Sequence, residues 1–165
     1  MRFFPFVQIA AIQISIAVTY FLVAQIALGF ATIAGNMTLI WPSSGIALAV
    51  LIKLGKKYAL GVYLGAFAAG VYVGNPHYVS GLISLGNTLE PLIAVYLLRF
   101  LPFSSNLYHI HDYFSLVVAG IVGAIASGFL GSIAIMLAGF ISPIELATVF
   151  IHWWMSDAIG VLLIA

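Results

Sequence analysis

Long apolar runs follow one another along the whole chain, separated by short groups of Gly, Pro, Asn and Lys. The runs lack the alternation of apolar and polar residues that marks the strands of a membrane barrel, and their length suits helices. The pattern therefore predicts six helices. Their expected ranges are Pro5–Ala34, Pro42–Leu54, Tyr58–Gly74, Tyr78–Leu101, Asp112–Phe140 and Pro143–Ala165.

The composition indicates that these helices belong to a membrane protein. Hydrophobic residues make up 64% of the 165 residues and charged residues 5%, and the mean hydropathy is +1.23. A soluble domain carries about 25% charged residues, so the lipid bilayer is the expected surrounding. Backbone groups in lipid must be satisfied within the chain. The expected fold is an all-α polytopic bundle forming one domain over 1–165. The sequence contains no basic run of the kind that would indicate a nucleic-acid partner.

The basic residues predict the orientation of these spans. With a cytoplasmic N-terminus, every basic residue falls in or beside a cytoplasmic segment, and the opposite joints hold none. These residues are Arg2, Lys53, Lys56, Lys57 and Arg99. Six spans would return the C-terminus to the cytoplasm. The chain ends on the apolar stretch "GVLLIA", which favours the front part of a longer protein.

Two acidic residues fall deep inside predicted spans. Glu90 lies 12 residues after Tyr78, and Asp157 lies 14 residues after Pro143. Both helices run in the same direction, so at about 1.5 Å per residue both acids lie roughly 18–21 Å from the outer end. Charged groups inside a membrane are costly and usually face the protein interior. We therefore expect the two carboxyl groups to meet at one level.

The second predicted helix is too short to cross the bilayer. From Pro42 to Lys53 it covers roughly 16 Å, against a hydrocarbon core of about 30 Å. If Lys53 lies at the inner interface, "WPSSG" begins this helix near the bilayer middle. Ser43 or Ser44 would help to cap it, and its free N–H groups would favour an anion or a carboxylate. Residues 35–41 would then dip inward and line a cavity.

Further polar residues lie next to the two acids along the sequence. Asn87 and Glu90 share a helix face, and Pro91 leaves the carbonyl of Asn87 without its helical partner. Trp153 lies one turn before Asp157, with His152 beside it. The candidate ligand-binding residues are Trp41, Ser43, Ser44, Gly45, Asn87, Glu90, His152, Trp153 and Asp157.

The same residues also fit a purely structural role, in which they only join helices by hydrogen bonds. Two carboxylates in a low dielectric cannot both stay ionised cheaply, so a proton, a metal ion or a ligand amine could bridge them. The stretch "HIHD" at 109–112 has metal-ligating residue types, but its spacing is a weak signal and we assign no metal site. We assign no catalytic residue. The row of small residues at 119–131 favours packing inside the domain, with a homodimer face as the alternative.

Four segments in register resemble the first-type membrane-associated sensor domain, the MASE family: "WPSSGIALAVL", "LGAFAAG", "LGNTLEPLIAVYLLRFL" and "WWMSDAIGVLLIA". The residues that match the family's motifs are Trp41, Pro42, Ser44, Gly45, Asn87, Glu90, Trp153, Asp157 and Gly160. The resemblance begins at about residue 38. It departs from the family in the number of spans, which is typically about eight rather than six.

The resemblance implies a sensory input module in a bacterial inner membrane, followed by a cytoplasmic diguanylate cyclase, phosphodiesterase, histidine kinase or PAS domain. It implies no enzymatic activity for these residues themselves. A small ligand or ion of unknown identity would bind between the second, fourth and sixth helices and shift the sixth against the fourth. A small-solute transporter or transporter substrate-binding subunit is the alternative, since broken helices and midplane carboxylates also occur there. A scaffold subunit without a ligand is a third reading.

Overall fold

A computed structural model describes residues 4–29 and 38–165 of the chain. These residues form helices and no strand, which confirms the all-helical fold. The helices are α1 (Phe4–Gly29), α2 (Pro42–Leu54), α3 (Ala59–Tyr72), α4 (His77–Leu97), α5 (Ile110–Leu137) and α6 (Leu146–Ile164). Short 3-10 turns, η1 (Lys56–Tyr58) and η2 (Pro143–Glu145), lead into α3 and α6.

The predicted boundaries differ from these by a few residues. α2 has the predicted bounds, because Pro42 fixes its first turn and Gly55 follows its end with a φ of 98°. α5 ends three residues before the predicted Phe140, because Gly139 adopts a φ of 76° and the Phe140 N–H bonds back to the Ile135 carbonyl. The predicted end of the first helix, Ala34, lies outside the described residues.

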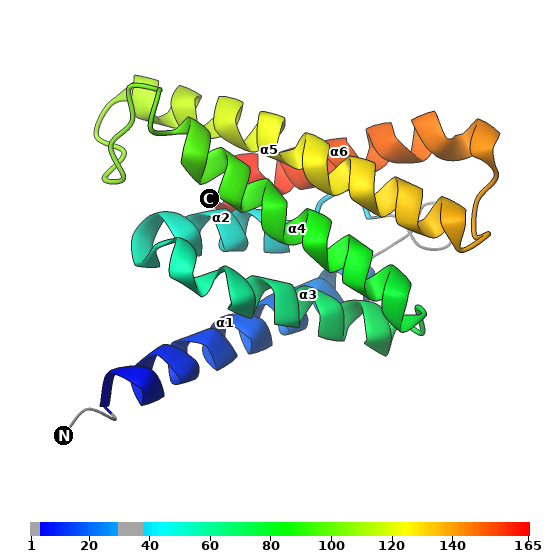
Figure 1. Cartoon of the computed structure of the whole chain (residues 1–165). Coiled ribbons are helices and arrows are strands. Elements are labelled where there is room, and N and C mark those ends of the chain that lie inside the picture. The colour runs from blue at the N-terminus through cyan, green and yellow to red at the C-terminus, as the bar shows by residue number, and fades with distance from the viewer. Residues whose placement is uncertain (1–3, 30–37) are drawn as a thin grey trace.

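The short helix α2 occupies the middle of the bundle. α1 and α3 pack along one side, α5 and α6 along the other, and α4 crosses between the two pairs (Figure 1). α2 contacts α1, α4 and α6, so it touches both sides. A helix in this position can connect polar side chains that come from distant parts of the sequence.

Small residues allow the helices around α2 to approach closely. A Cβ on Gly123 of α5 would lie 2.5 Å from the carbonyl oxygen of Glu90, and one on Gly131 would lie 2.7 Å from the ring of Trp153. On α3, Gly65 meets the backbone of α1 at Ala17 in the same way. The small-residue row of α5 therefore packs inside the domain, against α4 and α6.

The basic residues of the described chain gather at one end of the bundle, at the left of Figure 1, where α2 and α4 end and α3 and α5 begin. There the Lys53 ammonium donates to the Ser105 carbonyl at 2.6 Å, and Lys56 lies over the Tyr96 ring. Arg2 lies outside the described residues. This one-sided charge supports the predicted orientation, which stays a prediction.

Among the described residues, three helical segments are long and apolar enough to cross a membrane: Phe6–Gly29, Ile110–Leu137 and Pro143–Ile164. α4 has 21 residues, but it carries buried polar side chains that lower its hydropathy. α2 and α3 have 13 and 14 residues. The structure thus supports a membrane protein, while the predicted count of six spans stays a prediction.

Candidate functional site

The hydroxyl of Ser44 connects the two acids of the bundle interior. Its Oγ lies 3.0 Å from Oε2 of Glu90 on α4 and 3.1 Å from Oδ1 of Asp157 on α6. All three side chains are 1% exposed. Residues separated by 46 and 113 positions along the sequence therefore meet at one point. We call Glu90 and Asp157 the acid pair, and Ser44 the serine that bridges them.

Close contact between α2 and α6 holds this point in place. The Trp41 N–H donates to the Ser156 carbonyl at 3.0 Å, so the residue before α2 is bonded to the α6 backbone. A Cβ on Gly160 would overlap the Trp41 carbonyl oxygen, and one on Gly45 would overlap the Gly160 carbonyl oxygen. Glycine at both positions therefore lets the start of α2 lie directly against α6, beside Asp157.

The acid pair has no counter-charge among the described residues. The ion pairs found there involve only Asp112 with His109 and His111. In addition, Oε1 of Glu90 and Oδ2 of Asp157 are buried and have no hydrogen-bond partner among the described residues. Buried polar groups are nearly always hydrogen-bonded, so two such oxygens in one cluster call for an explanation.

Sequence reasoning missed two polar residues, Tyr20 and Ser127, which bond to the candidate residues Trp41 and Asn87. Tyr20 of α1 is 1% exposed, and its hydroxyl accepts a hydrogen bond from Nε1 of Trp41 at 3.1 Å. Ser127 of α5 donates to Oδ1 of Asn87 at 2.7 Å. Tyr20 stands in an otherwise ordinary apolar run, and Ser127 lies in the small-residue row, so neither carries a signal of its own in the sequence.

Three other candidate residues have different neighbours from those of the acid pair. Ser43 is buried, but its hydroxyl points to the Tyr20 carbonyl at 3.4 Å rather than to the acids. Trp153 is half-buried and packs its ring on Gly131. His152 is exposed on α6, away from the buried cluster. A role in ligand binding stays a prediction for all of these residues.

Two hollows of the described residues lie away from the acid pair. One of about 190 Å³ is lined by α1 and α2, including Ile16, Thr19 and Val50, and a second of about 50 Å³ lies beside Lys53 and Phe103. Neither is lined by the acid pair. The side chains of Ser44, Glu90 and Asp157 are each 1% exposed, so protein atoms pack closely around them.

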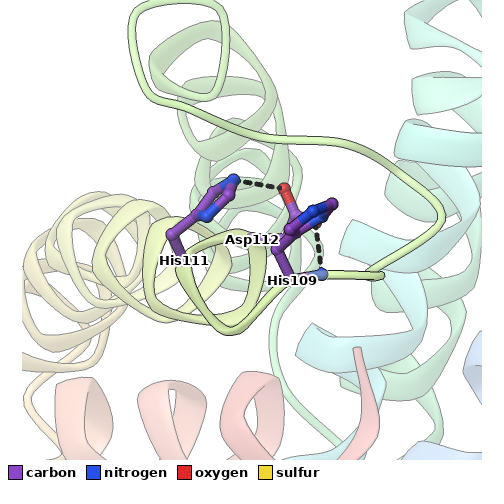
Figure 2. A group of neighbouring side chains, drawn as sticks. All are labelled: His109, His111 and Asp112. Carbon is purple, nitrogen blue, oxygen red and sulfur yellow. Dashed lines mark hydrogen bonds and ion pairs between the residues drawn. The ribbon is translucent and has the colours of Figure 1, made fainter.

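His109, which directly precedes α5, and His111, in the first turn of α5, lie beside the carboxylate of Asp112 (Figure 2). Nδ1 of His109 and Nε2 of His111 lie 3.8 Å and 3.5 Å from the carboxylate oxygens of Asp112, and the potential ligand atoms lie within 4.8 Å of one another. However, the same carboxylate already accepts the N–H groups of Ser104 at 2.7 Å and His109 at 3.0 Å. These bonds explain a buried Asp112 without a metal: it fastens the loop to the first turn of α5.

Replacing Asp112 with alanine is therefore expected to loosen this loop. Hydrogen exchange should become severalfold faster at the amides of Ser104 and His109, because both lose their acceptor. Exchange measured by mass spectrometry on the chain in nanodiscs checks this. The double variant His109→Ala/His111→Ala is the matched control and should leave these amides protected. Equal loss of protection in the control would contradict the anchoring role of Asp112.

The fold and the cluster define an all-helical membrane domain whose buried polar groups connect three helices. Its particular identity comes from sequence comparison: the family model MASE1 matches residues 12–165, and the chain belongs to the MASE1 family. MASE1 is a family of membrane-associated sensor domains, so the chain is a membrane sensor domain acting in signal transduction. No curated protein and no solved structure matches the chain.

Proposed function

We propose that this chain is the sensory input domain of a bacterial inner-membrane signalling protein, and that its stimulus acts on the acid pair. The observation that carries the proposal is the position of Ser44, which touches Glu90 of α4 and Asp157 of α6 at once. A change in charge at this point acts on three helices together. The two buried, unpartnered carboxylate oxygens also support a site that binds something from outside the chain.

The route from the acid pair to an output partner runs along α6. From Asp157, α6 continues to Ile164 and approaches the basic end of the bundle, where the Tyr113 hydroxyl donates to the Leu162 carbonyl. In the predicted orientation this end faces the cytoplasm. A small rotation or shift of α6 against α2 and α4 would then reach a cytoplasmic diguanylate cyclase, phosphodiesterase or histidine kinase. Such a shift requires that the stimulus favours one of two packings.

Joining residue 165 to a diguanylate cyclase domain without its own sensor tests this function. We expect the double variant Glu90→Gln/Asp157→Asn to change the cyclic-di-GMP level of the cells severalfold, because it removes the charge while nearly conserving shape. Glu145→Gln is the matched control, since Glu145 is exposed and, among the described residues, bonds only Ser142. Membrane levels of all variants are compared by immunoblot. An unchanged output at equal levels would refute the proposal, and solute uptake into vesicles would favour a transporter.

A further inference from the structure

The acid pair places more negative charge in the bundle than the described residues can balance. Glu90 and Asp157 are both 1% exposed, and no basic side chain of the described chain pairs with them. Lys53, the charged residue of α2, is directed to Ser105 at the other end of that helix. Two uncompensated charges in such surroundings are very unfavourable. Among the described residues nothing supplies the positive charge that two ionised acids would need.

The hydrogen-bonding capacity of the Ser44 hydroxyl indicates what form this positive charge takes. Ser44 has one O–H, so it donates to one carboxylate and can only accept from the other. Its Oγ lies at hydrogen-bond distance from both, 3.0 Å and 3.1 Å. Both contacts are hydrogen bonds only if one of the two acids carries a proton and donates it to Ser44.

We propose that the ligand of this site is one exchangeable proton, held by Glu90 or Asp157 and shared between them through Ser44. The proposal names the ligand of the sensor, and its role in signalling rests on the proposed function. With the proton on Glu90, its O–H donates to Ser44 Oγ, and the Ser44 O–H donates to Asp157. In the reverse arrangement the Glu90 O–H and the former Ser44 O–H bonds break, and new O–H bonds form on Ser44 and Asp157. The net charge of the group stays at −1.

The geometry favours a proton over a metal cation. Ca²⁺ and Mg²⁺ are usually held by six or more oxygens, which is more than the side chains of Ser44, Glu90 and Asp157 provide. The hollows described above are not lined by the acids. A proton needs no cavity, and it converts one of the unpartnered oxygens from part of an anion into part of a neutral acid, which is easier to bury.

Loss of the shared proton would act directly on helix packing. Two carboxylates would then face one hydroxyl, which can satisfy only one of them, and their repulsion would drive α4 and α6 apart beside the start of α2. The titratable group that faces both acids from α1 is Tyr20, while α5 contributes Ser127, which does not titrate. His152 of α6 is exposed. The proton content of the acid pair is thus the variable that this part of the domain can report.

Infrared spectroscopy of the chain in micelles of a detergent without ester or carboxyl groups tests the proposal, because a protonated carboxyl group absorbs apart from an ionised one. The chain contains four acidic side chains in all, so single amide variants of Glu90, Asp112, Glu145 and Asp157 assign each side-chain carboxyl signal. We expect the wild type to show a protonated carboxyl band at neutral pH that shifts in heavy water and titrates in two separate steps. Glu90→Gln and Asp157→Asn should each leave one step, and the double variant should lose the band.

The controls make each outcome decisive. Asp112→Asn and Glu145→Gln should leave the band and both of its steps unchanged. Absence of a protonated carboxyl band in the wild type at neutral pH overturns the proposal, and this measurement needs no variant to fold. Loss of the band on adding Na⁺, K⁺, Mg²⁺ or Ca²⁺ at constant pH would also overturn it, in favour of a metal cation. The spectra need no output domain, so their failure is distinct from failure of the reporter experiment.

Discussion

Replacing Gly160 with alanine is expected to lower the free energy of unfolding by about 3 kcal/mol, at the upper end of the range for overpacked cores. The added Cβ would overlap the Trp41 carbonyl oxygen, which belongs to the backbone and cannot move aside as a side chain could. The start of α2 would have to leave α6, and Ser44 would move away from Asp157. Unfolding in mixed micelles with increasing denaturing detergent, followed by circular dichroism, measures the loss.

Gly81→Ala is the matched control for this substitution. Gly81 lies inside α4, and a Cβ there would meet only the Tyr63 hydroxyl at 3.6 Å, an ordinary contact. Alanine has the higher helix propensity, so this variant should be more stable than the wild type by about 0.5–1 kcal/mol. If Gly160→Ala unfolds at the same detergent concentration as Gly81→Ala, the tight contact between α2 and α6 does not exist.

Replacing Ser44 with alanine is expected to cost about 3 kcal/mol of stability, although the change removes a single oxygen atom. Glu90 and Asp157 would each lose their hydrogen-bond partner, and an unsatisfied buried polar group costs about 1–3 kcal/mol. The loss should appear in the same unfolding experiment. It should also be smaller at low pH, where both acids carry protons and no charge remains buried.

The neighbouring Ser43 provides the control, because the two serines are equally buried and differ only in their partners. The Ser43 hydroxyl lies 3.4 Å from the Tyr20 carbonyl oxygen, a long and weak hydrogen bond. Ser43→Ala should therefore change the free energy of unfolding by less than about 1 kcal/mol. An equal effect of both substitutions would mean that Ser44 does not bridge the acids.

The sequence did not reveal whether Ser43 or Ser44 faces the acids, and helix geometry explains why. Successive residues of an α-helix point about 100° apart, so Ser43 and Ser44 must face different neighbours. Which of them faces the acids depends on the rotation of α2 about its own axis. That rotation is set by the contacts of Trp41 and Gly45 with α6, which bring together residues far apart in the sequence.

His152 is another residue whose direction the sequence analysis did not predict. It precedes Asp157 by five residues, which places it about 140° away around the helix. Since Asp157 points inward, His152 is directed outward and is exposed. Tyr20 and Ser127 were missed for the opposite reason: a tyrosine or a serine in an apolar helix has many uses, and only its neighbours reveal which one applies.

The sequence by itself determined that the chain is a helical membrane protein, because 5% charged residues leave lipid as the only suitable surrounding. It also determined that Glu90 and Asp157 lie at a similar depth, because helical rise converts residue number into height. Only the tertiary structure decided that both acids touch Ser44. Height along a helix follows from counting residues, whereas the direction of a side chain depends on how neighbouring helices pack.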